Sequence, residues 1–196
     1  MKPVCRLLCL LLLTCSFAQA QQFGAFPPST RWKQIDNDTA RVIFSRGADW
    51  QASRIATLIR RAAADTPLSL GAGLRKVNVV LHNRTTLANG YVALGPFRSE
   101  FYLVPGFNLF DQGNTPWYEQ LALHEYRHVQ QYNNFRHGLS KGFYYLFGEQ
   151  GLALANAMTV PDWFFEGDAV HTETALSRQG RGRLPYFLSG YNSLWL

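Results

Sequence analysis

The sequence predicts one α+β domain, in which a small mixed sheet is followed by helices. Short β-branched or alternating segments typical of strands occur between residues 41 and 104. Residues 115–176 instead repeat their apolar side chains at helical spacing. Strands first and helices later is the order typical of α+β proteins. The length of 196 residues is enough for one such domain with a buried core.

The first twenty residues have the pattern of a secretory signal peptide. Lys2 and Arg6 precede a leucine-rich run, and the segment ends in Ala18-Gln19-Ala20. A basic start, a short apolar middle and small residues at the cleavage point are typical of such a peptide, and the apolar run is too short for a transmembrane anchor. We therefore expect an exported protein with a lead-in loop over residues 21–31 and its domain over residues 32–196.

All three cysteines, Cys5, Cys9 and Cys15, lie in this first segment. Lipidation of Cys15 is the alternative to simple cleavage, and Thr14 before it disfavours that alternative. The remaining chain forms no disulfide, so any metal ion must be bound by His, Asp or Glu. An exported protein without cysteine suits the periplasm or the cell surface of a Gram-negative bacterium.

The charge pattern disfavours nucleic acid as a partner. The formal net charge is +6, and loss of Lys2 and Arg6 with the signal peptide leaves +4. The basic residues are scattered singly, without a lysine–arginine run or an aromatic–basic stripe. Such a distribution is typical of a solvated basic surface.

Four segments predict the strands. These are Arg41–Ser45, Lys76–His82, Tyr91–Leu94 and Glu100–Val104, the last two after an Asn89-Gly90 turn. Residues 50–64 between the first two have the apolar spacing of a helix, which we expect Asp49 to cap. Residues 105–113 predict a loop.

Three helical segments follow. Thr115 as N-cap and Pro116 at the first helical position predict a helix that ends near Asn134. Lys141–Val160 is long and apolar, and predicts a buried helix interrupted at Gly148 and Gly151. Pro161 begins a further helix with the sequence WFFEGDAVHTETAL.

The first of these helices carries the stretch LALHEYRHVQQY, residues 121–132. Positions four apart on a helix differ by only about 40° in direction, so His124 and His128 project from one face and can bind one ion. Glu125 lies close enough to that face to reach a water on the ion. Two neutral imidazoles and a carboxylate base are the parts that zinc catalysis requires.

This face is expected to point inward, because Trp117, Leu121, Tyr132 and Phe135 continue the same stripe. Buried histidines without partners would be costly, and a metal ion removes that cost. The alternative is a pair of hydrogen-bonded core histidines without metal.

A catalytic zinc ion usually has three protein ligands. Glu166, at the start of the following helix and after an aromatic cluster, is the best candidate for the third. Asp168 points about 200° away from Glu166 and is weaker, and His171 and His137 are further alternatives. The competing interpretation of Glu166 is a carboxylate that the helix dipole stabilises.

Two supporting roles remain open in the sequence. Glu173 lies two turns beyond Glu166 on the same face, where it can hydrogen-bond a zinc-binding histidine or simply face solvent. His171 is the candidate to stabilise a developing oxyanion, with Tyr186 as another choice.

HEYRHVQQ followed by WFFEGDAVHTE resembles the gluzincin superfamily of zinc metallopeptidases. The resemblance implies a zincin-like fold in which His124, His128 and Glu166 bind Zn²⁺ and Glu125 is the base. Glu166-Gly167-Asp168-Ala169 matches that family's E-G-x-A motif, and Glu173 matches its later glutamate. His171 stands where the family usually has tyrosine.

NGYVALGP, LALHEYRHVQQ, WFFEGDAV and GRGRLPYF are similar to segments of the peptidase-MA-like domain of exported bacterial proteins, which often precedes a TolB-like β-propeller. This resemblance covers about residues 30–190. It implies a neighbouring β-propeller domain or partner, and an edge strand that holds an extended peptide substrate, for which Glu100–Val104 is the candidate. Lys141–Val160 would be an inserted helix or hairpin, and the early end of the chain suggests a truncated or short variant.

Three functional hypotheses follow. The first is an exported zinc metallopeptidase that acts on peptides or proteins. The second is a catalytically silent binding module that retains zinc on a peptidase scaffold, and the third is a metal-free exported domain. Glu125 favours the first over the second, because a purely structural zinc site needs no base.

Overall fold

The computed structural model describes residues 26–66, 70–71, 73–107 and 113–194. The chain divides into two compact units, residues 1–30 and 31–196, and the fold described below is that of the second unit. The predicted signal peptide lies outside the described residues. Among the described helices, none combines the length and the hydropathy needed to cross a bilayer.

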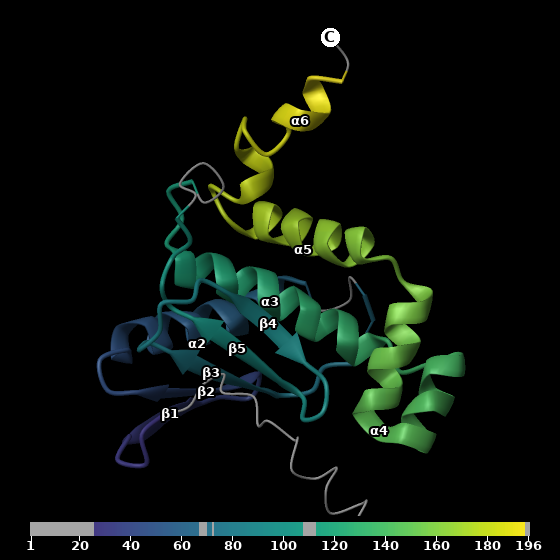
Figure 1. The fold of residues 1–196 in the computed structure, drawn as a ribbon, viewed down its shortest axis with the longest axis horizontal. Coiled ribbons are helices and arrows are strands. Elements are labelled where there is room, and N and C mark those ends of the chain that lie inside the picture. The colour runs from purple at the N-terminus through teal and green to yellow at the C-terminus, as the bar shows by residue number, and fades with distance from the viewer. Residues whose placement is uncertain (1–25, 67–69, 72, 108–112, 195–196) are drawn as a thin grey trace, which may run out of the picture. The chain divides into compact units, whose positions relative to one another are not determined.

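The core element is a mixed five-stranded sheet with the strand order β1-β2-β3-β5-β4 (Figure 1). Its strands are β1 (Trp32–Asp36), β2 (Ala40–Ser45), β3 (Val77–His82), β4 (Gly90–Ala93) and β5 (Arg98–Tyr102). The three inner strands are parallel to one another, whereas β1 and β4 run antiparallel to their neighbours. With the helices that follow, this confirms the predicted α+β class.

Two features of the sheet differ from the sequence prediction. Strand β1 follows the expected lead-in loop and was not predicted as a strand, because WKQID is polar and almost wholly exposed. The predicted edge strand was also wrong. Strand β5 lies inside the sheet between β3 and β4, and β4 forms the edge. The hairpin after β4 brings β5 back beside β3. Local residue patterns do not predict which strands pair, so the edge strand was misassigned.

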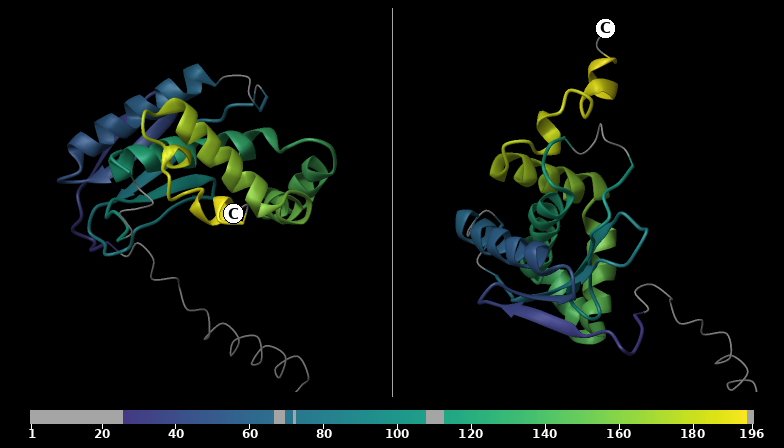
Figure 2. Two further views of the ribbon diagram at one scale, coloured as in Figure 1. Left: turned by 90° about the horizontal axis from the view of Figure 1, so that it is seen from above. Right: turned by 90° about the vertical axis from the view of Figure 1, so that its left-hand side faces the viewer.

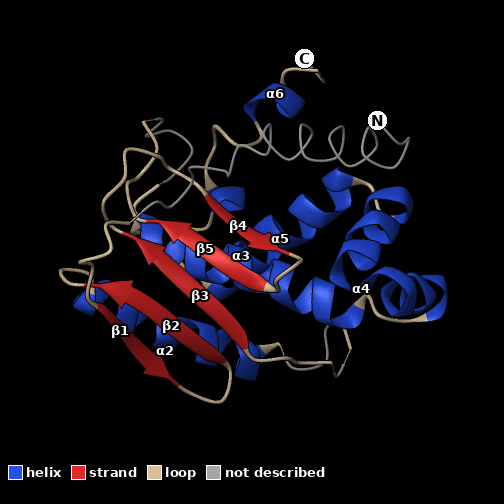
Figure 3. Ribbon diagram, turned by 60° about the horizontal axis from the view of Figure 1, so that its bottom comes forward, coloured by secondary structure: helices blue, strands red, loops and turns tan. Residues whose placement is uncertain are grey.

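Helices α2 (Asp49–Asp65) and α3 (Trp117–Asn134) cover one face of the sheet (Figure 3). Alternate residues of the inner strands point at them, so that Val42, Val79 and Phe101 are almost fully buried. Both predicted helix caps are wrong. Ala48 caps α2, and Pro116 caps α3, in each case without a side-chain hydrogen bond.

Asp49, which was expected to cap α2, instead forms an ion pair with Lys33. Its carboxylate accepts a 2.6 Å hydrogen bond from Lys33 Nζ in β1, which ties the edge of the sheet to α2.

Helix α4 (Gly138–Thr159) has a kink at Gly148, as the two glycines predicted, but it is not buried. Only Ser140, Gly151, Leu152 and Ala155 are buried in it, while Tyr145 and Leu146 are 72% and 75% exposed. The apolar sequence of α4 indicates that burial of its side chains would be favourable. It does not indicate whether another element of the fold packs against them.

Helix α5 (Asp162–Leu176) packs on α3, and α3 lies between α5 and the sheet (Figure 2). The chain then forms the short η2 (Arg181–Arg183), which packs against α5, and α6 (Ser189–Asn192). Helix α3 is thus covered on two sides, and this is why it is the most buried helix of the domain.

The kink in α4 gives a test of the fold. Gly148 has φ 63° and ψ −145°, a conformation that is essentially restricted to glycine. Gly148→Ala is therefore expected to lower the free energy of unfolding by about 1–3 kcal/mol. Gly142→Ala in the same helix is the control, because its added Cβ meets no atom within 4 Å and alanine favours a helix by about 1 kcal/mol. Urea denaturation of both variants measures the difference, and equal stabilities would contradict the expectation.

Candidate metal centre

The middle of α3 is buried together with its polar side chains. The buried polar residues of this helix are Gln120, His124, Glu125, Arg127, His128, Gln130 and Gln131. Buried polar groups require partners. Helix α5 supplies many of them, and the arrangement of these partners defines the site.

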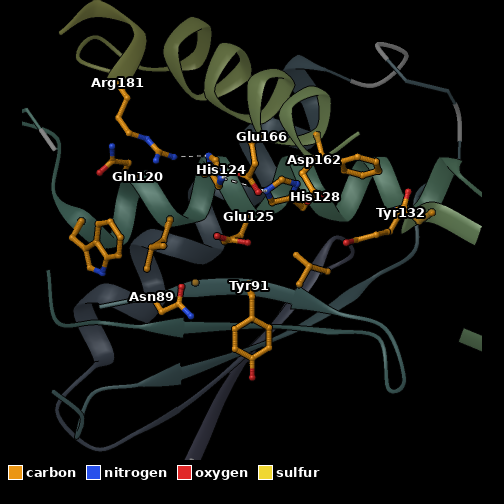
Figure 4. A pocket seen from close by; sticks show the side chains of 16 residues that line it. Asn89, Tyr91, Gln120, His124, Glu125, His128, Tyr132, Asp162, Glu166 and Arg181 are labelled. Carbon is orange, nitrogen blue, oxygen red and sulfur yellow. Dashed lines mark hydrogen bonds and ion pairs between the residues drawn. The ribbon is translucent and has the colours of Figure 1, made fainter. Parts of the chain in front are cut away.

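Three side chains converge between α3 and α5 (Figure 4). The Nε2 atoms of His124 and His128 lie 3.3 Å apart. The two carboxylate oxygens of Glu166 lie 3.2 Å from His124 Nε2 and 3.5 Å from His128 Nε2. Among the described residues, this trio is the group of at least three His, Asp or Glu side chains that is placed to hold a metal ion.

The spacing of these atoms fits a tetrahedral ion. Ligands held about 2.0 Å from a tetrahedral zinc ion are about 3.3 Å from one another. The two imidazole Nε2 atoms, 3.3 Å apart, have that separation. Each of them lies close to a different oxygen of Glu166, at 3.2 and 3.5 Å. Two imidazole nitrogens and a carboxylate are a donor set that zinc accepts, and a fourth position would remain for water.

The other nitrogen of each imidazole has its own partner. His128 Nδ1 donates to Gln131 Oε1 at 2.7 Å, and His124 Nδ1 lies 3.3 Å from Glu173 Oε2. A proton on Nδ1 leaves the lone pair of Nε2 free for a metal ion. Arg181 also lies 2.7 Å from His124 Nδ1. A guanidinium only donates hydrogen bonds, so in this contact His124 Nδ1 is the acceptor. The partner that fixes a proton on Nδ1 is therefore established for His128.

The carboxylates in this cluster favour their ionised forms. Hydrogen bonds to His124 and His128 hold the pKa of Glu166 well below its usual range. Burial opposes ionisation of Glu173, but hydrogen bonds to His124 and Arg181 lower its pKa to about 2. Burial also lowers the pKa of His124, but the bonds to Glu166 and Glu173 outweigh it and raise this pKa to about 9.

Glu125 lies beside this cluster and points toward β4 (Figure 4). It is only 5% exposed, and its Oε2 has no hydrogen-bond partner. Burial raises its pKa. Gly90 of β4 permits the close approach, because a Cβ at that position would lie 2.8 Å from Glu125 Oε1. The sequence indicated only a turn at Asn89-Gly90 and no contact of Gly90 with Glu125.

The remaining candidates are not brought into the cluster. Asp168 forms a two-pronged ion pair with Arg127, at 2.7 and 2.9 Å, and also accepts a hydrogen bond from Gln131. His137 and His171 are exposed and do not line the pocket, and Tyr186, 54% exposed, does not line it either. Their geometry does not favour roles as ligands or oxyanion donors.

The cluster opens into a cavity of about 410 Å³. Residues from α3, β4, α4, α5 and η2 form its walls, among them Tyr132, Asn156 and Arg181. Tyr132 lies four residues after His128, and this spacing predicted it on the same inward-facing stripe, without a chemical role. Arg181 belongs to the GRGRLPYF segment. No sequence signal identified Asn156 or the tautomer-fixing Gln131.

Comparisons with protein-family models, with curated proteins and with solved structures gave no match for this chain. Function is therefore inferred from the geometry of the site.

The ligand assignment predicts opposite results for two carboxylates of α5. Glu166→Ala removes a metal ligand and should weaken zinc binding more than about 100-fold, because even the loss of a hydrogen-bond partner behind a ligand typically costs 10- to 100-fold. Asp168→Ala should leave binding nearly unchanged but destabilise the protein by about 3 kcal/mol, since it removes the ion pair between Asp168 and the buried Arg127.

Competition with a chelator and urea denaturation measure the two effects. Glu173→Ala is the intermediate case, with an expected 10- to 100-fold loss of zinc affinity. A larger loss for Asp168→Ala than for Glu166→Ala would show that the ligand assignment is wrong.

Proposed function

We propose that this protein is a zinc-dependent metallopeptidase of the gluzincin type. The observation that carries the proposal is the juxtaposition of a three-ligand cluster with a buried, unpartnered carboxylate oxygen on Glu125, both facing one cavity. When bound, zinc acts as a Lewis acid and lowers the pKa of a coordinated water. The zincin-like fold is part of the same proposal, supported by a mixed sheet whose edge strand lies beside the ligand-bearing helix.

Glu125 acts as the general base. Its position next to His124 and its free Oε2 place it to take a proton from the attacking water. Burial raises the pKa of Glu125 and makes it a stronger proton acceptor than an exposed glutamate. The same carboxyl group then donates that proton to the leaving amine.

Strand β4 provides the main-chain platform for an extended substrate. It is the edge strand, and residues 89–92 line the cavity opposite Glu125. An edge strand has unpaired N–H and C=O groups that can bind a peptide by strand addition. This role was expected for Glu100–Val104, but β5 is paired on both sides.

Tyr132 takes the role of the oxyanion donor in this proposal. Its side chain extends into the cavity beside His128 (Figure 4). A hydroxyl group there can donate a hydrogen bond to the carbonyl oxygen as negative charge develops on it. Export, the β-propeller neighbour and a location at the periplasm or cell surface stay predictions from the sequence.

The role of Glu125 has a direct test. Glu125→Gln keeps the size and a hydrogen bond but accepts no proton, so hydrolysis of an unstructured protein substrate should fall by about 10²- to 10⁴-fold. Zinc content should remain at about one ion per chain, since Glu125 is not a ligand. Metal analysis and a fluorescent casein assay measure these quantities. Absence of activity in the wild-type protein, with zinc bound, would favour the silent binding module instead.

The role of Tyr132 predicts a separate effect. Tyr132→Phe removes the hydroxyl group and should lower kcat by about 10²- to 10³-fold, as is typical for loss of an oxyanion donor. KM and zinc content should change little, because the ring remains packed near Phe165, with 5.8 Å between ring centroids. The matched control is Tyr186→Phe, whose hydroxyl group does not line the cavity. Equal kcat values for Tyr132→Phe and the wild type would remove Tyr132 from the mechanism.

A further inference from the structure

The cavity has opposite charges at its two ends. Arg181 lies at the end nearest the start of α3, beside Gln120, and Asp162 lies at the other end, beside Tyr132 (Figure 4). Within the described part of the chain, Asp162 has no hydrogen bond or ion pair. Arg181, in contrast, already binds Glu173 through Nε at 3.1 Å and through a terminal nitrogen at 2.9 Å. Apart from Glu125, which serves as the base in the proposed mechanism, Asp162 is therefore the carboxylate of the cavity walls without a partner among the described residues.

A second acceptor lies in the same wall. Asn156, near the end of α4, lines the cavity, and its Oδ1 is buried without a hydrogen-bond partner. Helix α4 leads directly into α5, so Asn156 and Asp162 lie close together in the chain. A buried carbonyl oxygen without a partner is costly, and a ligand with several N–H groups would satisfy it.

The direction of β4 indicates which end of a peptide reaches these acceptors. In Figure 4 the strand runs from Asn89 to Tyr91 in the same direction as α3 runs from Gln120 to Tyr132. Antiparallel pairing is the more stable arrangement for an added strand. A peptide bound in this way has its N-terminal end toward Asp162 and its C-terminal end toward Arg181, so its direction agrees with the charges of the cavity.

We propose that the site binds peptides with a free N-terminus, and that Asp162 and Asn156 bind the α-ammonium group. This inference rests on the proposed function and makes the protein an aminopeptidase. Asp162 lies one helical turn before Glu166, about 6 Å along the axis of α5. A single extended residue spans about 3.5 Å. With allowance for the contacts at each end, this spacing fits one residue between the ammonium group and the carbonyl group at the metal cluster.

The test measures binding, so that it does not depend on hydrolysis. The protein carries Glu125→Gln and is loaded with zinc, and the probes are Xaa-Ala-Ala-Ala amides with a free or an acetylated N-terminus. We expect the free peptides to bind at least about tenfold more tightly, as a hydrogen bond to a charged group typically provides. Addition of Asp162→Asn should reduce this ratio to about one. Addition of Asp38→Asn, in the turn between β1 and β2, removes a charge far from the cavity and should leave the ratio unchanged.

Each other result overturns the inference. These results are equal affinity for the two sets, no binding of either set, or a preference that persists after Asp162→Asn. A third probe is the acetylated peptide with a free C-terminal carboxylate, and tighter binding of this peptide than of either amide would assign recognition to Arg181 instead. Hydrolysis by the protein with Glu125 intact is measured separately. Equal cleavage of both sets would retain the peptidase and reject the aminopeptidase, whereas a binding preference without cleavage would retain recognition of the free N-terminus and reject the peptidase.

Discussion

The polar contact between α3 and α5 is the constraint on which the rest of the domain depends. Helix α3 lies between the sheet and α5, so its polar side chains have little access to water. Glu166, Asp168 and Glu173 span about two turns of α5, and each meets a different partner group on α3. Burial of charge is tolerable only when it is paired in this way. The two helices therefore fix each other's rotation, and the metal cluster lies where they meet.

The sequence predicted the ligand cluster better than it predicted the surrounding structure. His124 and His128 were placed on one face because helical spacing is a local property. The aromatic residues before Glu166 were expected to bury it, but its side chain is 62% exposed. Trp163 and Phe164 are also exposed in large part, and only Phe165 of these aromatic residues is buried. The structure brings His124, His128 and Glu166 together as expected. Glu173 also reaches His124 from behind, which settles the alternative of a solvated surface residue, since it is 1% exposed.

The errors concern properties that are not local. The order of β4 and β5 in the sheet depends on which of the two strands pairs with β3. Both segments have similar residue patterns, so the sequence does not distinguish them. The exposure of α4 depends on whether another element covers it. His171 was considered for a catalytic role because of its position in a motif, but the register of α5 on α3 turns it outward. Gly90, Gln131 and Asn156 owe their importance to contacts between segments that are distant in the sequence. The spacing of residues within one segment does not predict such contacts.

The shortness of β4 has a consequence for turnover. The strand has only four residues, Gly90–Ala93, so it can offer few main-chain hydrogen bonds to an added chain. Each such bond contributes a net of about 1 kcal/mol. A bound segment is then held firmly enough to be aligned, but a cleaved fragment that keeps only part of these bonds dissociates readily. The short strand also limits aggregation, because a second copy of the protein finds too few free main-chain groups on β4 to pair with it.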